Sequence, residues 1–414
     1  MDNHRETIVT IPDGFTNPLL HQEAAAVEEN SSRWSDLSVD VLELILRRLG
    51  PVDHLRFGET CRSWRSARSL HRTRLDLPTP QLPWLLSGPT SFLSKGYRLK
   101  FFSPSDGRRY TISIPKRTPR QYWVPGSCAN WLITDAGRDI FLVNPFTGVE
   151  LRLPRIIAER EPNQDFAIAV SSHPGAPYGA VVLANLWTVS LICKRPGDRH
   201  WLWFHLTGED RRVCQVAAVG RKFYGITHGR RLVDIDPDRS PQVVVMNQVG
   251  SILGNPQGRT HVFLVESDGD LLAVVMSCPN LRRSTPSFSF LRWDVETSFW
   301  EAIESIGDRL LFLGLSSSIS VAAREHGVAG GRIYTIGPHS TGIYDLRTRE
   351  GEVLCCCRSS SWRTWVAPRL FYWEGQADEI SWWWDYAEEA VKVFLLALIS
   401  VSISFVLCWA LNEI

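Results

Sequence analysis

The spacing of apolar residues divides this chain into three regions. Near the amino terminus, Leu42, Ile45 and Leu46 recur at steps of three and four residues, which places them on one face of a helix. From about residue 91 to 372, short apolar runs alternate with Gly, Pro, Asp and Asn, as strands and turns do. Residues 393–411 carry no charged side chain. The pattern therefore predicts a helical module, a long strand-rich body and an apolar tail.

The helical module is predicted to contain three short helices. Ser38 suits the N-cap of the first helix, and Asp40 lies where the helix dipole favours negative charge. Gly50-Pro51 is expected to end that helix, because glycine tolerates a left-handed backbone, and to open a second helix that breaks near Gly58. A third helix follows, up to about residue 70. Because about 40 residues rarely make a self-sufficient core, part of the apolar surface is expected to meet a partner.

This stretch resembles the F-box. The residues in register with the family pattern are Leu37, Asp40, Leu42, Ile45, Leu46, Leu49, Pro51, Asp53, Leu55, Cys61 and Trp64. Ser38 stands where the family usually has a proline, and Gly50 precedes Pro51. In that family the module binds a Skp-type adaptor, which joins it to a cullin-RING ubiquitin ligase. The resemblance implies adaptor contacts at Leu37, Leu42, Ile45, Leu46, Leu49, Pro51, Leu55, Cys61 and Trp64. An ordinary three-helix domain is the alternative.

Recurrent hairpins, each an apolar strand, a polar turn and a second strand, mark the long β-rich region. The markers at residues 107, 148, 197, 238, 297 and 348 follow one another at intervals of 41 to 59 residues. Such intervals suit about four strands per unit, as in propeller blades, with residues such as Trp131 and Trp293 packed between blades. We therefore expect a multidomain α plus all-β protein, in which a small three-helix F-box precedes a β-propeller of about six or seven blades and a C-terminal hydrophobic helix. A pair of β-sandwiches is the competing fold.

An F-box followed by a divergent, kelch-like propeller is similar to a large plant family of F-box proteins that carry a domain of formerly unknown function. Trp123-Val124-Pro125 and the later Trp365-Val366-Ala367-Pro368 are similar to segments of that family. In this family the propeller is taken to select protein targets, and a few members bind kinases. The resemblance names no target for this chain, because the loops that choose one are the variable part.

Composition narrows the function classes. A formal net charge of +1 argues against a nucleic-acid-binding protein, which concentrates positive charge. The adjacent residues Cys355–Cys357 lack the spacers of zinc ligands, so we interpret them as buried thiols in a reducing compartment. Asp234 and Asp236 are better explained by a turn than by catalysis. We expect no catalytic residue, no metal and no cofactor. A propeller enzyme or a sugar-binding lectin would instead need polar residues that converge at the central channel.

The apolar tail predicts a membrane span. The uncharged run at residues 393–411 comes close to the ~20 residues that cross about 30 Å of hydrocarbon as a helix, so the candidate span is placed at residues 391–411. The side chains before the run suit the water–lipid boundary: Trp382, Trp383, Trp384, Tyr386 and Lys392. Such a helix would be a tail anchor in an intracellular membrane, with the rest of the chain facing the cytosol. The alternatives are a buried final strand or helix, and a location in the cytoplasm or nucleus.

These regions predict a domain order and a function. We expect a disordered tail at residues 1–32, an F-box at 33–75, a linker at 76–90, the propeller at 91–372, an aromatic and acidic segment at 373–390 and the candidate anchor at 391–411. The leading hypothesis is a non-catalytic substrate-recognition subunit of a Skp-cullin-F-box ligase, with the adaptor and an unknown protein target as partners. The alternative is a membrane-tethered propeller scaffold that takes no part in ubiquitylation.

Overall fold

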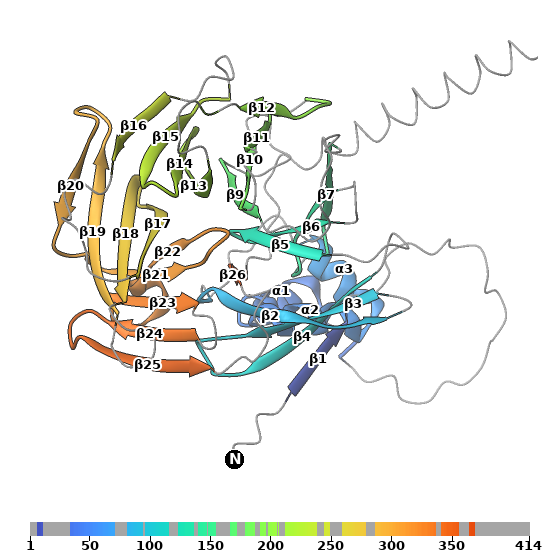
Figure 1. Cartoon of the computed structure of the whole chain (residues 1–414). Helices are drawn as coiled ribbons and strands as arrows, with labels where there is room; N and C mark the ends of the chain where they lie inside the picture. The colour runs from blue at the N-terminus through green and yellow to red at the C-terminus, as the bar shows by residue number, and fades with distance from the viewer. Residues whose placement is uncertain are drawn as a thin grey trace, which may run out of the picture. The chain divides into compact units, whose positions relative to one another are not determined.

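The computed structural model describes residues 6–10, 34–70, 81–93, 96–115, 123–135, 140–146, 148–154, 166–171, 179–186, 191–195, 198–204, 206, 212–237, 244–248, 259–278, 286–336, 341–355 and 364–368. These residues form a module of three α-helices and six β-sheets that are arranged around a central axis (Figure 1). The six sheets are the blades of a β-propeller. The predicted propeller is therefore confirmed, with six blades, and a pair of sandwiches is excluded.

The helical module consists of α1 (Val39–Leu46), α2 (Pro51–Thr60) and α3 (Arg62–Leu70). Ser38 is the N-cap of α1, as predicted, because its Oγ accepts a 3.4 Å hydrogen bond from the backbone N–H of Val41. Gly50 does not adopt the left-handed backbone that was expected of it. It is extended, with φ of −71° and ψ of 170°, and is the N-cap of α2. This glycine therefore begins the second helix, while the first has already ended at Leu46.

The predicted break of the second helix at Gly58 is wrong, because α2 continues to Thr60. A Cβ atom at Gly58 would lie 2.7 Å from Nη1 of Arg68 on α3. The glycine thus makes room for a neighbouring side chain, and the helix tolerates it at a cost of about 1 kcal/mol relative to alanine. The helix ends at Cys61, whose backbone is extended, with φ of −157°.

The blades are numbered along the chain, and their strands are given from the axis outward. Blade 1 contains β26 (Thr364–Val366), β2 (Trp84–Leu93), β3 (Gly96–Phe102), β4 (Arg109–Pro115) and β1 (Glu6–Thr10). Blade 2 contains β5 (Trp123–Cys128), β6 (Trp131–Asp135), β7 (Ile140–Val143) and β8 (Glu150–Leu153). Blade 3 contains β9 (Phe166–Val170), β10 (Val181–Asn185), β11 (Leu191–Lys194) and β12 (Leu202–Phe204).

The remaining blades complete the ring. Blade 4 contains β13 (Val213–Val219), β14 (Lys222–Thr227), β15 (Arg231–Ile235) and β16 (Val244–Gln248). Blade 5 contains β17 (Arg259–Ser267), β18 (Asp270–Cys278), β19 (Ser287–Asp294) and β20 (Phe299–Ile303). Blade 6 contains β22 (Ile319–Ala322), β21 (Arg309–Leu313), β23 (Arg332–Ile336), β24 (Thr341–Asp345) and β25 (Glu350–Cys355), and the short 3-10 helix η3 (Ala323–His326) follows β22.

Blade 1 closes the ring with segments from both ends of the described chain. β26 pairs antiparallel with β2, with Trp84 opposite Val366, so late and early residues share one sheet. At the outer edge β1 pairs in parallel with β4. Residues 6–10, which the sequence placed in a disordered tail, therefore form a strand. The propeller also begins earlier than expected, since β2 starts at Trp84, within the predicted linker.

Blade 6 departs from a simple up-and-down order. β21 pairs antiparallel with β22 but in parallel with β23, so the chain runs to the axis after β21 and only later continues outward. This detour carries Gly314–Ser318, which we call the crossing segment, to the innermost part of the blade.

Apolar side chains fill the spaces between neighbouring blades. Trp131 of blade 2 and Trp201 next to blade 3 lie in one buried cluster, and Trp293 and Trp300 of blade 5 pack against blade 4 in another. The predicted packing of these tryptophans between blades is confirmed. Each blade thus buries its faces against the next, which stabilises the ring.

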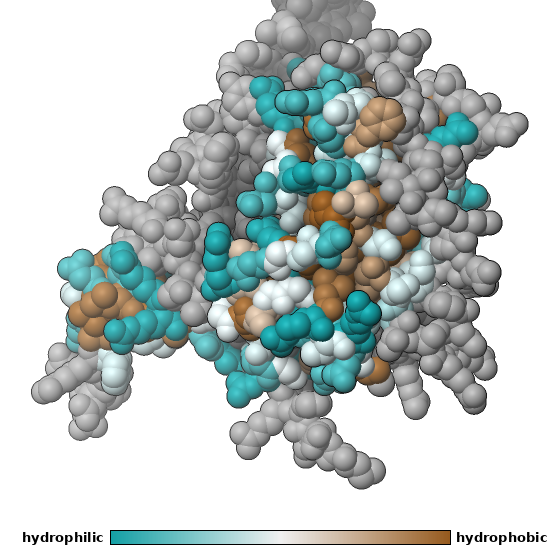
Figure 2. All heavy atoms as spheres, turned by 90° about the vertical axis from the view of Figure 1, so that its left-hand side faces the viewer, coloured by the Kyte–Doolittle hydropathy of each residue, from teal (hydrophilic) through white to brown (hydrophobic). Residues whose placement is uncertain are grey.

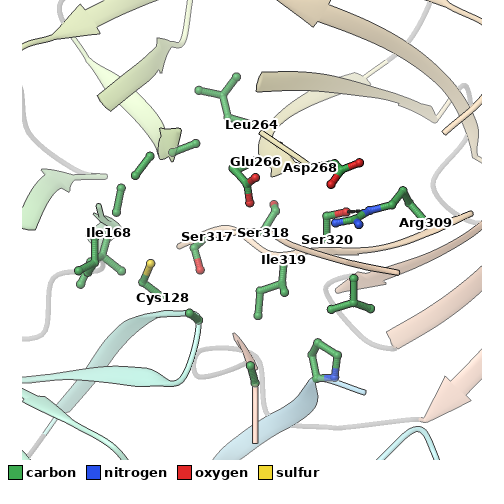
Figure 3. Close-up of a pocket in the computed structure, with 18 of the residues that line it drawn as sticks. Cys128, Ile168, Leu264, Glu266, Asp268, Arg309, Ser317, Ser318, Ile319 and Ser320 are labelled. Atoms are coloured by element: carbon green, nitrogen blue, oxygen red, sulfur yellow. Dashed lines mark hydrogen bonds between the residues drawn. The ribbon is translucent and has the colours of Figure 1, made fainter. Parts of the chain in front are cut away.

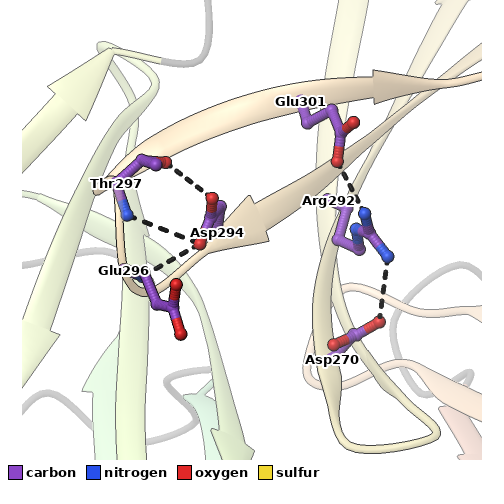
Figure 4. Close-up of polar contacts among 6 residues, drawn as sticks. All are labelled: Asp270, Arg292, Asp294, Glu296, Thr297 and Glu301. Carbon is purple, nitrogen blue, oxygen red and sulfur yellow. Dashed lines mark hydrogen bonds and ion pairs between the residues drawn. The ribbon is translucent and has the colours of Figure 1, made fainter.

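The repeat in the sequence corresponds to one turn per blade, between the third and fourth strands from the axis in blades 1 to 5 and between the fourth and fifth strands in blade 6. Asp294 accepts hydrogen bonds from the backbone N–H of Glu296 and the hydroxyl of Thr297, at 2.9 Å and 2.8 Å (Figure 4). Asp345 and Asn144 bind the backbone N–H two residues ahead in the same way. The recurring Asp or Asn is therefore a turn-forming residue, as its spacing suggested.

The outer part of blade 5 is a mixed polar and apolar surface. Arg292 on β19 pairs with Glu301 on β20 at 2.6 Å and with Asp270 on β18 at 3.9 Å (Figure 4). Val295 and Phe299 are exposed nearby. Figure 2 looks onto the side where β19 and β20 lie in Figure 1 and shows hydrophobic atoms gathered between hydrophilic ones. Because all three charged side chains are about half exposed, these ion pairs add little to stability.

The predicted membrane span at residues 391–411 lies outside the described residues, as do Trp382, Trp383, Trp384, Tyr386 and Lys392. Among the residues that the structure does describe, no helix is both long enough and apolar enough to cross a bilayer. The structure thus gives the predicted C-terminal hydrophobic helix no support, and the tail anchor stays a prediction.

Candidate functional site

The helical module has a small interior of its own. Leu42 and Leu46 of α1 are fully buried against Phe57 of α2 and Ala67 of α3. The partly buried side chains packed against this cluster are Leu37, Ile45, Leu49 and Trp64. Most of the apolar residues that the sequence assigned to adaptor binding therefore hold the three helices together, and their contact with an adaptor stays a prediction.

Trp64 is fixed by two contacts within the module. Its Nε1–H donates a 2.8 Å hydrogen bond to the backbone carbonyl of Trp34, and its ring stacks on Phe57 with centroids 4.4 Å apart. Cys61, three residues earlier, is half-buried at the end of α2. Pro51 and Leu55 belong to α2, but the structure does not describe their side chains.

Large apolar side chains remain on the outside of the same module. Trp34 is 64% exposed and Leu44 is 60% exposed, and Val39 and Val41 are also exposed. Val41 and Leu44 lie three residues apart, one turn along α1, on the side away from the buried Leu42 and Leu46. We call Val41 and Leu44 the exposed apolar face. The sequence reasoning missed it because it assigned binding to the regular three- and four-residue stripe, which is the interior.

The crossing segment joins the blades at the axis. The backbone carbonyl of Ser316 accepts a 3.0 Å hydrogen bond from the N–H of Ile168 in blade 3, and its hydroxyl lies 2.9 Å from that of Thr364 in blade 1. The hydroxyl of Ser317 donates a 2.5 Å hydrogen bond to the carbonyl of Ser127 in blade 2. The crossing segment is therefore bonded to blades 1, 2 and 3, although it belongs to blade 6.

Gln215 extends this network to blades 4 and 5. From β13 its side-chain amide donates a 2.5 Å hydrogen bond to the carbonyl of Gly314, and its Oε1 accepts a 2.8 Å bond from the N–H of Leu264 on β17. Glycine is required at position 314, because a Cβ atom there would lie 2.6 Å from the carbonyl oxygen of Ser317. All six innermost strands thus meet around the crossing segment.

A cavity of about 780 Å³ lies next to the crossing segment. On three inner strands the lining of the cavity extends toward the carboxyl end, beyond the residue that helps to hold the crossing segment: Cys128 follows Ser127, Val170 follows Ile168 and Glu266 follows Leu264. The cavity therefore lies toward the carboxyl ends of the inner strands, and the crossing segment forms its floor. We call this cavity the cup.

The two halves of the cup differ in chemistry (Figure 3). Blades 2, 3 and 4 line it with small and apolar side chains: Cys128, Ala129, Ile168, Ala169, Val170, Val216, Ala217 and Ala218. Blades 5 and 6 add the apolar Leu264, Ile319, Val321 and Ala322, and they contribute the charged and hydroxyl-bearing side chains: Glu266, Asp268, Arg309, Ser317, Ser318, Ser320, Glu325 and His326. Three carboxylates thus face one guanidinium across the polar half.

The cup is suited to binding and offers weak nucleophiles. Burial raises the pKa of the Cys128 thiol to about 11, so this thiol stays protonated at neutral pH. Arg309 donates a 2.9 Å hydrogen bond from Nε to the hydroxyl of Ser320. Across the part of the chain that the structure describes, no group of three His, Cys, Asp or Glu side chains could hold a metal ion. Polar residues do converge at the channel, and their arrangement fits recognition of a charged ligand.

Two family models match the chain. The KIB1-4 beta-propeller model matches residues 101–345, and the F-box domain model matches residues 34–74. The F-box/kelch-repeat protein KIB1 of Arabidopsis thaliana is 25% identical over 303 residues, which cover 71% of this chain and 76% of KIB1. F-box only protein 7 of the same plant is 23% identical over 391 residues, covering 80% of this chain and 93% of the relative.

These matches agree with the fold. The matched range of the first model lies within the six blades, and the second covers α1, α2 and α3. The resemblance to the F-box and to a plant family with a kelch-like propeller is confirmed. Since the propeller model matches more than half of the residues, this chain belongs to the KIB1-4 beta-propeller family and carries an F-box domain ahead of the propeller.

Proposed function

We propose that this protein is a substrate-recognition subunit of a Skp-cullin-F-box ubiquitin ligase. The F-box binds a Skp-type adaptor and the propeller holds the protein target. The observation that supports the proposal most is the presence of both matched domains in one chain, each with an accessible surface of its own. Such a subunit is not itself catalytic. It raises the concentration of the target near the ubiquitin-charged enzyme.

The F-box residues divide between two roles in this proposal. Leu42 and Leu46 form the interior, so they support binding by keeping the helices in place. The exposed apolar face supplies the contact, because Val41 is 40% exposed and Leu44 is 60% exposed, so both side chains are available to a partner. Burial of one such side chain at an interface contributes about 1.5–3 kcal/mol.

Capture of the full chain by an immobilised Skp-type adaptor tests this division. We expect the double variant V41E/L44E to lose capture while its circular dichroism and melting temperature stay unchanged, because both changes replace exposed side chains with a good helix former. V353E is the matched control, since Val353 is an exposed apolar residue on β25 of the propeller, and it should be captured normally.

Replacement of the buried residues should give a different result. L42A is expected to lose capture together with the helical signal of the F-box, because removal of a fully buried leucine costs about 2–5 kcal/mol. Undiminished capture of V41E/L44E would contradict the proposed contact. A folded intact chain that the adaptor fails to capture would favour the alternative, a propeller scaffold outside the ubiquitin system, whose membrane tether at residues 391–411 stays a prediction.

A further inference from the structure

The cup is a cavity that is closed on one side by the crossing segment. The crossing segment forms its floor and is bonded to inner strands of blades 1, 2 and 3 directly and to blades 4 and 5 through Gln215. A ligand therefore enters from the carboxyl ends of the inner strands and stops at the floor. A volume of about 780 Å³ lies within the range of small-ligand pockets, about 300–1,000 Å³, and accommodates one or two side chains of a peptide.

The charges on the wall indicate which ligand fits. Glu266 and Asp268 point into the cup from the end of β17 and the turn after it (Figure 3). Glu325 of η3 lines the same half, and so does Arg309 of β21. Three carboxylates against one guanidinium leave a negative surplus, which attracts a cation and repels an acidic segment.

Two of these acidic residues are held in place by the local backbone. Oε1 of Glu266 accepts a 2.9 Å hydrogen bond from the N–H of Gly269, and Asp268 has a left-handed backbone, with φ of 58°, in the turn between β17 and β18. The carboxylate of Glu266 is thus oriented before a ligand arrives, which lowers the entropy cost of binding. The wall formed by blades 3 and 4, with Ile168 and Val216, offers apolar contact.

We propose that the cup binds a segment of the target protein in which a lysine or arginine lies next to an apolar residue. The basic side chain contacts Glu266 and Asp268, and its apolar neighbour packs against the wall formed by blades 3 and 4. The inference rests on the proposed function, since it assigns the recognised chemistry to the part of the ligase subunit that holds the target.

A positional peptide library tests the proposal with the full chain bound to a Skp-type adaptor. Immobilised random octapeptides, each with one fixed residue, are probed with this complex, and the dissociation constant of the strongest peptide is then measured by fluorescence anisotropy. We expect fixed Lys or Arg to bind better than fixed Asp or Glu. E266Q/D268N should weaken the strongest peptide by about tenfold or more, because charge-assisted contacts are lost.

The variants preserve the local structure. Glutamine keeps the acceptor for Gly269, and asparagine tolerates the left-handed backbone at position 268. E352Q is the matched control, since Glu352 is an exposed carboxylate on β25 that does not line the cup, and it should bind as the wild type does. A preference for acidic peptides, or equal binding by E266Q/D268N, would overturn the proposal.

The same peptide library, probed also with the full chain in the absence of the adaptor, separates the two proposals. Capture by the adaptor without selection of basic peptides contradicts the inference about the cup and leaves the ligase function supported. Selection of basic peptides by a folded chain that no adaptor captures supports the cup as a binding site and contradicts the ligase function.

Discussion

His54 in α2 is a buried imidazole whose charge state is tied to the folding of the F-box. Its pKa is lowered from 6.5 to about 4, mainly by burial and also by the positive charge of Arg68. The hydrogen bond with the backbone of Leu46 and the charge of Asp53 act in the opposite direction. Because the unfolded chain binds a proton near pH 6.5 and the folded one only near pH 4, acidification favours unfolding between these values.

We expect this residue to lower the free energy of unfolding of the F-box by as much as about 3 kcal/mol as the pH falls from 6.5 to 4. Above pH 6.5 the imidazole is neutral in both states and contributes no pH dependence. Below pH 4 it is protonated in both states and the loss is complete. Hydrogen exchange of the α1, α2 and α3 amides measures the opening free energy across this range.

H54L is the matched variant for this measurement, because leucine fills a similar volume without a titrating group. The opening free energy of its F-box should depend less on pH between 4 and 6.5 than that of the wild-type F-box does. If the opening free energies of the two proteins changed equally with pH, His54 would not be the titrating residue. Sequence reasoning missed His54 because its shift arises from Arg68 and the surrounding burial, which only the packed helices create.

Among the elements, β26 is short but closes the ring of blades. It has three residues, yet it pairs with β2 and brings Trp365 into the space between blades 6 and 1. Trp365 is fully buried, its ring packs edge-on against Phe312, and its Nε1–H donates a 3.1 Å hydrogen bond to the carbonyl of Leu313. This one side chain therefore fastens the last described strand to the neighbouring blade.

We expect W365A to lower the unfolding free energy of the propeller by about 3–5 kcal/mol, because it leaves a cavity and an unpaired carbonyl at the ring closure. Urea denaturation followed by circular dichroism measures the change. F299A, which shortens an exposed aromatic on β20, is the control and should change stability by less than about 0.5 kcal/mol. A W365A protein as stable as F299A would mean that the ring closes without this contact.

Local elements could be predicted from the sequence, and long-range contacts could not. Several blades use the same Asx turn, so the markers at residues 297 and 348, which follow Asp294 and Asp345, located their blades correctly. The crossing segment has no such signal, since Ser316 reaches Ser127 across 189 residues of sequence. For the same reason the cup, whose walls come from separate blades, was visible only as a general expectation of a channel.

At the scale of the whole molecule, the two proposed contacts use different residues and different structural principles. The exposed apolar face relies on burial of Val41 and Leu44 against the adaptor. The cup relies on charges placed by Glu266 and Asp268 and on an apolar wall. Since the two surfaces share no residue, each can be removed alone, and a ligase subunit requires both at once.

We expect the two sets of variants to separate target binding from ubiquitylation. In a reconstituted cullin-RING ligase, a reporter protein fused to the basic peptide selected by the cup should be ubiquitylated by the wild-type chain. V41E/L44E should still bind the reporter but leave it unmodified, because the reporter is no longer brought near the ubiquitin-charged enzyme. E266Q/D268N should still bind the adaptor but lose the reporter, and E352Q should match the wild type. Loss of reporter binding in V41E/L44E, or undiminished ubiquitylation by E266Q/D268N, would show that the two surfaces do not divide the function in this way.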